Sequence, residues 1–332
     1  MFTPNGAGAF SIPKAPYVLG LEGGGAFGAF TAGVLCTLLA DPRIPLPAAI
    51  SGTSAGAVNA VVMAHAMTNE TDDGAARRRI IHDLHNLWHD RLPHVMFEYM
   101  RDYMGPGPAM LGRMVMPPVG SLYNWYLFLD LMMETWLYMG GTLPRVPANH
   151  NPLAMLLRHV DFEQLNQQKK LKLYIATTLA DNRNASRVFT ESELSADVVA
   201  ASGALPDRFE PITIDGVRYM EGGYHHNPPL LQPFADGFAE LLLVRLNADD
   251  VNPPRHLLEQ RIYDLAQVFS EPLKRDLALL ADQGLAVSEV AMQGHYGFRP
   301  PDKTKTSRLM LSNLFKAGEA AARAALDTLN ND

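Results

Sequence analysis

The regular pattern of the chain begins with two short apolar runs, each followed by a longer apolar segment. "YVLGLE" (17–22) and "AAISG" (48–52) end at glycine-rich turns, so we expect buried strands there. Residues 26–40 and 55–67 follow them and are predicted to be helices. Strand–helix units repeated at this spacing favour parallel strands and a layered α/β fold.

Strand patterns return after residue 170. Residues 211–223 predict a hairpin, because Asp215-Gly216 suits a two-residue turn at its tip. A helix is predicted over 195–206, with Ser195 as its N-cap. Three further segments are predicted strands, the third being the last strand expected in the chain: 171–180, 187–190 and 240–247.

From residue 255 onwards the pattern is helical, with Pro272 expected to break one helix and a final helix over 306–329. The chain is therefore expected to have three parts: a loose arm rich in Gly, Ala and Pro at 1–15, a main α/β domain at 16–250, and a helical C-terminal extension at 251–332 packed on the core.

A helical insertion is predicted within the main domain, over 92–150, and it holds more than half of the 16 methionines. Its segment "LYNWYLFLDLMMETWLYM" (122–139) is apolar on nearly every side. One interpretation is a buried helix. The other is a lid over a site for long-chain lipid, because Met adapts to varied apolar shapes and Trp and Tyr suit a membrane interface.

The composition is that of a globular protein, with 332 residues, 47% hydrophobic and 19% charged. A net charge of −7 argues against a nucleic-acid partner. The single cysteine, Cys36, excludes an intramolecular disulfide and fits a reducing compartment. The N-terminus lacks the features of a signal peptide, and no uncharged stretch is long enough to span a bilayer. We expect a cytoplasmic protein, with peripheral contact to a membrane as the open alternative.

An amphipathic helix over 75–91 carries His82, His85 and His89 on its polar side. Three histidines raise the question of a metal site, but no carboxylate or cysteine completes a convincing ligand set. We therefore expect a solvated helix face and no metal.

The first candidate for chemistry is "GLEGGGAFG" (20–28), which lies between a predicted strand and a predicted helix. Its glycines leave backbone N–H groups accessible at a helix N-terminus, so the loop can hold a phosphate or an oxyanion. The spacing Gly23-x-Gly25-x-x-Gly28 also matches a dinucleotide-binding loop. That interpretation is disfavoured, because no acid follows at the end of the second strand.

The second candidate is Gly52-Thr53-Ser54-Ala55-Gly56, a G-x-S-x-G sequence between a predicted strand and a predicted helix. This is the context of a nucleophile elbow, in which flanking glycines permit a strained turn that exposes the serine hydroxyl. The third is "MEGGYHHNPP" (220–229), which puts the Glu221 carboxylate on a corner after the hairpin. An ordinary α/β-hydrolase triad is a rival interpretation, since His225 and His226 follow the acid.

These three motifs together resemble the patatin-like phospholipase family, whose pattern has a G-G-G-x-[K/R]-G loop, a G-x-S-x-G elbow and a D-G-[G/A] corner in this order. Similarity extends to "NPLAMLLRHVDFEQL" (151–165) and "ASGALPDRFEPITIDG" (201–216), and it covers about 17–250. The resemblance implies a three-layer α/β/α patatin-like fold around a central, mostly parallel sheet. It also implies hydrolysis of lipid acyl esters by a serine–acid dyad, without metal or cofactor.

By this resemblance Ser54 is the nucleophile and Glu221 the acid of the dyad. Backbone N–H groups of the glycine loop form the oxyanion hole, with Gly52 and Gly56 as the elbow glycines. The candidate oxyanion-hole residues are Gly23, Gly24 and Gly25.

The sequence departs from the family pattern twice, since Glu221 stands where the family has Asp and Phe27 where it has a basic residue. The first hypothesis is an active enzyme of phospholipase A or lysophospholipase type, with a lipid or acyl-ester substrate at a membrane surface. The second is a weakened or inactive patatin-like domain that binds lipid or regulates. The third is a Ser–His–Glu esterase assisted by His225 or His226.

Overall fold

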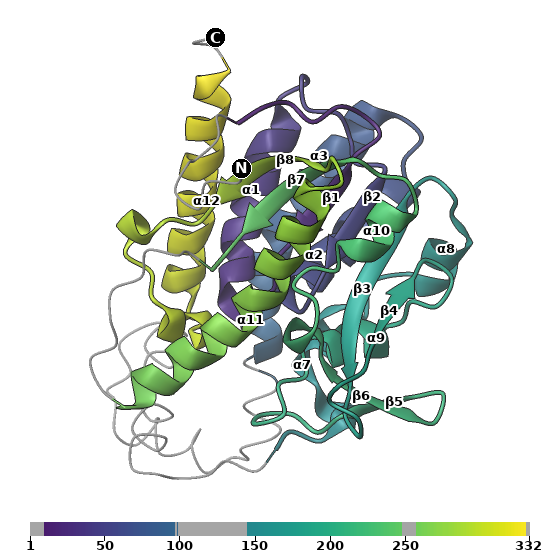
Figure 1. Cartoon of the computed structure of the whole chain (residues 1–332), viewed down its shortest axis with the longest axis vertical. Helices are drawn as coiled ribbons and strands as arrows, with labels where there is room; N and C mark the ends of the chain where they lie inside the picture. The colour runs from purple at the N-terminus through teal and green to yellow at the C-terminus, as the bar shows by residue number, and fades with distance from the viewer. Residues whose placement is uncertain (1–9, 97, 99–144, 248–256, 330–332) are drawn as a thin grey trace.

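The computed structural model describes residues 10–96, 98, 145–247 and 257–329 (Figure 1). At its centre lies an eight-stranded mixed sheet with the order β5-β6-β3-β2-β1-β7-β8, and β4 pairs with β3 beside this path. The strands are β1 (Val18–Leu21), β2 (Ala49–Gly52), β3 (Lys172–Leu179), β4 (Ser186–Thr190), β5 (Ile212–Ile214), β6 (Val217–Glu221), β7 (Glu240–Arg245) and β8 (Ala286–Ala291).

Five neighbouring strands, β3-β2-β1-β7-β8, are parallel to one another. Their carboxyl ends therefore lie at one edge of the sheet, where ligands bind in α/β folds. The strands β4 and β6 run antiparallel to β3: β4 lies on the side of β3 away from β2, and β6 follows β2 on the same side. The β5–β6 hairpin turns through Asp215 (φ 51°) and Gly216 (φ 78°), as its sequence predicted.

Alternate residues along the strands enter two separate cores. On β1 the side chain of Val18 packs on one face of the sheet, while Leu19 and Leu21 pack on the other. Leu241 and Leu243 of β7 share the face of Val18. This alternation confirms a three-layer fold, because both faces of the parallel sheet are apolar and covered.

Helices α1 (Gly28–Ala40), α2 (Ala55–Thr68), α3 (Asp73–Asn86) and α12 (Arg308–Thr328) cover the face that holds the larger core. The other face carries α10 (Leu231–Ala235) and α11 (Leu257–Ala281), and α11 crosses in front of the sheet in Figure 1. Shorter elements complete the described chain: η1 (Gly25–Phe27), η2 (Leu87–Arg91), η3 (Ala148–His150), α7 (Pro152–Leu156), α8 (Phe162–Gln167), α9 (Ala196–Ser202), η4 (Gly222–Tyr224), η5 (Gly294–Tyr296) and η6 (Pro300–Thr304).

The last helix, α12, lies directly against α1. A Cβ built on Gly33 would come within 2.0 Å of the Phe315 carbonyl oxygen, and one on Gly318 within 2.0 Å of the Phe30 carbonyl oxygen. The two backbones therefore touch through a glycine on each helix, which ties the C-terminal extension to the first helix of the main domain.

The C-terminal extension differs from its all-helical prediction in two ways. Residues 286–291 form β8, which pairs parallel with β7 and becomes the edge of the sheet. Only Ser288 and Val290 in it are buried, so β8 lacks the continuous apolar run that marks a central strand. Pro272 lies inside α11 without ending it, since Leu273, Leu277 and Leu280 beyond it are buried against the sheet.

The predicted loose arm is packed in its described part. Phe10 is buried, and the Ser11 side chain lies 2.7 Å from the Ser288 hydroxyl on β8. The apolar segment 122–139 lies outside the described residues. Among the helices that the structure describes, none is long and apolar enough to cross a bilayer.

Candidate active site

The turn between β2 and α2 holds Ser54 in a strained conformation. Its φ of 53° lies in the left-handed region, which a residue with a Cβ rarely adopts and which is typical of functional sites. A Cβ on Gly56 would lie 2.1 Å from the Leu21 carbonyl oxygen, and one on Gly52 would lie 2.7 Å from the Gly56 carbonyl oxygen. Glycines on both sides therefore allow this turn to pack against β1.

Two hydrogen bonds to a helix and a loop elsewhere in the chain hold the turn. The Thr53 hydroxyl donates to the His226 carbonyl oxygen at 2.8 Å. The Ser54 N–H donates to the Ser202 hydroxyl at 2.9 Å, at the end of α9. Next to it, a Cβ on Gly203 would come within 3.3 Å of the Ser54 hydroxyl oxygen, so this glycine leaves the space beside the hydroxyl open.

Glu221 lies near Ser54 because β2 and β6 pair with successive parts of β3 on the same side of that strand. In the β3 register, Gly52 of β2 pairs with Ile175, and Glu221 of β6 pairs with Thr177. Because β2 runs parallel to β3 and β6 antiparallel to it, the C-terminal ends of β2 and β6 point toward each other. The Glu221 carboxylate, 3% exposed, accepts a hydrogen bond from the Gly223 N–H at 3.1 Å. It also lies close enough to the Ser54 side chain for that hydroxyl to lower the pKa of the carboxyl.

The Glu221 carboxyl is a strong base for an acid side chain. Burial raises its pKa to about 8, although the hydrogen bonds from Gly223 and Ser54 and the charge of Lys303 act in the opposite direction. A carboxylate of this basicity, bonded to a hydroxyl, can take the proton that the hydroxyl loses when it attacks an electrophile.

The glycine loop runs beside Ser54. Gly23 donates its N–H to the Asn227 side-chain oxygen at 2.7 Å, and a Cβ on it would lie 3.0 Å from the Ser54 Cβ. The Gly23 N–H is therefore already bonded to Asn227. This differs from the sequence-based expectation that it forms part of the oxyanion hole. The N–H groups of Gly24 and Gly25 have no acceptor among the described residues, and Gly25 has a φ of 57°.

Three polar residues behind the loop were not anticipated as part of the site. Glu22 is fully buried and accepts hydrogen bonds from the Leu246 and Asn247 backbone N–H groups and from the Asn247 side-chain amide. The Asn247 side-chain oxygen in turn accepts one from the Lys303 ammonium. The position of Glu22, an acid directly after a buried strand, could have indicated that it belongs to the site. No local sequence pattern indicates this for Asn247 or Lys303.

The two candidate histidines contact other partners. The His225 ring nitrogen lies 2.7 Å from the Arg183 carbonyl oxygen. The His226 ring lies 3.1 Å from the Ser186 hydroxyl on one side and 3.8 Å from the Asp276 carboxylate on the other. In the described part of the chain, no hydrogen bond joins either ring to Ser54.

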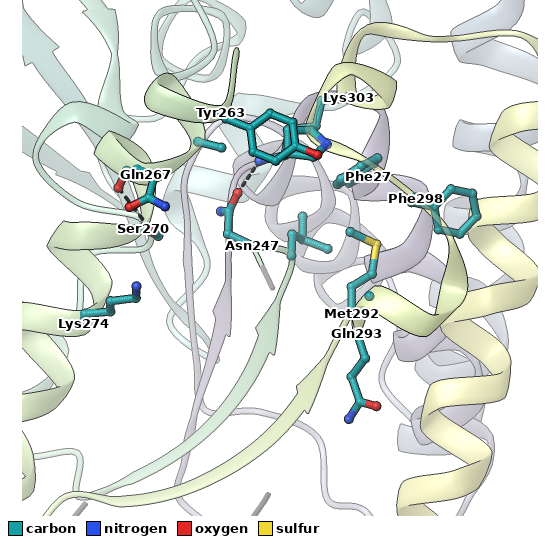
Figure 2. Close-up of a pocket in the computed structure, with 14 residues that line it drawn as sticks. Phe27, Asn247, Tyr263, Gln267, Ser270, Lys274, Met292, Gln293, Phe298 and Lys303 are labelled. Atoms are coloured by element: carbon teal, nitrogen blue, oxygen red, sulfur yellow. Dashed lines mark hydrogen bonds between the residues drawn. The ribbon is translucent and has the colours of Figure 1, made fainter. Parts of the chain in front are cut away.

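A cavity of about 90 Å³ opens beyond the glycine loop, between α11, β7, β8 and η6 (Figure 2). Phe27 and Lys303 line it together with Asn247, Tyr263 and Met292. Ser54 and Glu221 are not among its lining residues, so this cavity adjoins the candidate site without containing it. Within the described ranges, no group of three or more His, Cys, Asp or Glu side chains is placed to hold a metal ion.

A family model described as patatin-like phospholipase matches residues 19–234, which contain the glycine loop, the elbow and the Glu221 corner. The chain belongs to the patatin-like phospholipase family. Membership of this family supports a lipid hydrolase activity and explains why the three motifs meet at one edge of the sheet. A search of curated proteins found no significant match.

Two solved structures resemble this patatin-like chain at low identity. VipD from Legionella pneumophila is 14% identical with a TM-score of 0.40, over 91% of this chain and 67% of VipD. The type III effector protein ExoU is 18% identical with a TM-score of 0.28, over 92% of this chain and 54% of ExoU. The chain therefore spans little more than half the length of ExoU.

Proposed function

We propose that this patatin-like protein hydrolyses the acyl esters of lipids, as a phospholipase A or lysophospholipase, with Ser54 as nucleophile and Glu221 as base. The observation that carries the proposal is the closeness of the Ser54 side chain to the buried Glu221 carboxyl, whose pKa it lowers, beside the Gly24 and Gly25 N–H groups, which have no acceptor among the described residues. Family membership supports the class of substrate.

In the first half of the reaction, Ser54 Oγ attacks the ester carbonyl carbon and its proton passes to Glu221. The carbonyl oxygen becomes an oxyanion that the Gly24 and Gly25 N–H groups stabilise, each well-placed donor contributing about 2.7–4 kcal/mol. When the intermediate collapses, the carbon–oxygen bond to the leaving alcohol breaks and Glu221 returns the proton to that alcohol. The product is an acyl-enzyme at Ser54.

In the second half, a water molecule attacks the acyl carbon and gives its proton to Glu221. Collapse of this intermediate releases the fatty acid and returns the proton to Ser54. A raised pKa suits Glu221 to both halves, because a more basic carboxylate takes a proton more readily and still releases it to an alkoxide.

The length of Glu221 fits this role. With the family's aspartate at this position, the carboxylate would be one methylene shorter and would withdraw from the Ser54 hydroxyl unless the backbone moved. We therefore expect Glu221→Asp to lose about a hundredfold in rate, the usual cost of a misplacement of about 1 Å. A faster Glu221→Asp enzyme would show that the native acid is poorly placed.

A fluorophosphonate probe and fatty-acid release from phosphatidylcholine and lysophosphatidylcholine vesicles test the proposal together. We expect labelling and release by the wild type, and neither by Ser54→Ala. Ser186→Ala is the matched control, because Ser186 bonds His226 instead of Glu221, and it should keep both signals. A wild-type protein that is unlabelled and inactive but floats with the vesicles would instead be a lipid-binding domain.

The proposal places the reaction at the cytoplasmic surface of a membrane, where these lipids are presented. Flotation of the full chain with vesicles tests this part separately, and a protein that releases fatty acid only from dispersed monomeric substrate would contradict it.

A further inference from the structure

Lys303 comes from η6, far beyond the matched family region, and its side chain lies against the back of the glycine loop. Its ammonium donates a hydrogen bond to the Asn247 side-chain oxygen, drawn as a dashed line in Figure 2. The same nitrogen lies 5.6 Å from the centroid of the Phe27 ring, within the range of a cation–π contact. The residue keeps some exposed surface, but its charged end is surrounded by protein.

A continuous set of hydrogen bonds connects Lys303 to the start of the glycine loop. The Asn247 amide that accepts from Lys303 donates to the Glu22 carboxylate. Glu22 immediately precedes Gly23, whose N–H is held by Asn227 at 2.7 Å. The loop is thus tied on both flanks by buried polar groups.

The backbone of η6 also touches the loop. A Cβ on Gly25 would lie 2.4 Å from the Lys303 carbonyl oxygen. Gly25 carries one of the two N–H groups that have no acceptor in the described part of the chain, so Lys303, which brings the charge, also borders the candidate oxyanion hole.

The buried carboxyl groups around the glycine loop would be stabilised by a nearby cation. Glu22 and Glu221 are both buried, and buried carboxylates without a counter-charge are strongly unfavourable. The glycine loop has no basic residue of its own, since Phe27 occupies the position before Gly28. The Lys303 ammonium acts on both acids, lowering the pKa of each.

We propose that Lys303 is a positioning residue for acyl transfer: its buried ammonium, bonded through Asn247 to Glu22, holds the glycine loop so that Gly24 and Gly25 face the Ser54 hydroxyl. This inference rests on the proposed function of Ser54 and Glu221. It assigns part of the catalytic apparatus to a segment outside residues 19–234.

The main test compares Lys303→Met with Lys303→Arg in the full chain. We expect Lys303→Met to lower kcat/KM for lysophosphatidylcholine about 10- to 100-fold, the usual range for loss of a charged hydrogen bond. The loss should be mainly in kcat, because the loop acts on the oxyanion, and Lys303→Arg should recover a large part of it. Lys274→Met is the matched control, because Lys274 lines the same cavity and bonds Glu271 at 3.7 Å, and it should keep wild-type activity.

The pH profile separates this role from simple stabilisation of the fold. Because Lys303 lowers the pKa of Glu221, its removal should move the acid limb of kcat/KM to higher pH. A variant that is only less stable would lose active protein without moving that limb. If Lys303→Met does not fold, Asn247→Ser takes its place: it cuts the link to Glu22 while keeping the charge, and unchanged activity in it would overturn the proposal.

Chemical rescue gives a second readout. Lys303→Ala enlarges the adjoining cavity of about 90 Å³, which can then admit a small cation. We expect ethylammonium to raise the activity of Lys303→Ala at least tenfold, and ethanol to leave it unchanged. Equal effects of ethylammonium and ethanol would overturn the inference. So would wild-type activity in Lys303→Met when Ser54→Ala is inactive, and either result leaves the proposed function standing. An inactive wild type overturns both.

Discussion

Two buried glutamates border the glycine loop, and their partners differ. Glu22, at the end of β1, accepts hydrogen bonds only from N–H groups, including the backbone and side chain of Asn247. Glu221, at the end of β6, accepts a hydrogen bond from one backbone N–H and lies beside the Ser54 hydroxyl, which lowers its pKa. Burial raises the pKa of both carboxyls.

The difference shows that burial alone does not identify a catalytic base. Amide N–H groups cannot give up a proton to Glu22, so its bonds only hold the loop and β7 together. A hydroxyl can give its proton to Glu221, so the proposed mechanism assigns the same kind of side chain the role of a base. The identity of the partner atom, rather than the direction of the pKa shift, separates the two roles.

The largest effect expected from this comparison is the loss of activity in Glu221→Gln. The amide keeps the size of the side chain but cannot accept a proton, so fatty-acid release should fall about 10³-fold, within the range for loss of a general base. The assay is fatty-acid release from vesicles. A variant that retains a tenth of wild-type activity would remove Glu221 from the proposed mechanism.

The same replacement at the other acid should act on stability. In Glu22→Gln one amide NH₂ group would face N–H donors, so we expect the free energy of unfolding to fall by on the order of 2–3 kcal/mol. Thermal unfolding measures this, and Glu221→Gln is its matched control. Equal midpoints for Glu22→Gln and the wild type would contradict a structural role for Glu22.

The pH dependence of activity should follow Glu221. Its pKa of about 8 predicts that kcat/KM rises about tenfold per pH unit on the acid side and reaches its maximum near pH 8. Burial also lowers the pKa of Lys303 to about 8, so activity should decline at higher pH, and Lys303→Arg should remove that decline. A profile already flat from pH 5 would contradict both assignments.

The smallest effect is the pH dependence of stability. The Glu221 carboxyl has an ordinary pKa of 4.5 when unfolded and about 8 when folded, so the unfolded state releases its proton first as pH rises. Its contribution to the free energy of unfolding is therefore fully present below pH 4.5 and is lost as pH rises to about 8. Glu221→Gln has no group that titrates here, so its stability does not fall in this way. Its unfolding midpoint should therefore rise relative to that of the wild type between pH 5 and pH 8. A constant difference between the two proteins would show that the folded carboxyl is not strongly perturbed.

Local signals predicted most of the main domain. The β2–α2 junction around Ser54 and the Asp215-Gly216 turn follow from glycine and turn chemistry within a few residues. Ser195 caps α9 through its hydroxyl, as expected. The layered α/β fold follows from strand–helix repetition, and the two cores confirm the three layers that the family resemblance implied.

Elements whose stability comes from distant contacts were not predicted. β8 was missed because an edge strand needs only one covered face, and of its two buried residues, Ser288 and Val290, one is polar. Residues 10–15 were expected to be loose, but Phe10 and Ser11 are held by the core and by β8. Pro272 was expected to end a helix, yet packing of α11 on the sheet outweighs one missing backbone hydrogen bond.

The sequence by itself determined the nucleophile turn, the glycine loop and the acid corner, because each depends on a few adjacent residues. Only the tertiary structure decided that Glu221 reaches Ser54, since this depends on β2 and β6 ending at neighbouring positions along β3. It also decided that Lys303 of η6 donates a hydrogen bond to Asn247 behind the loop. These contacts join segments at least 56 residues apart, and their geometry is set by strand register and packing, which no local pattern encodes.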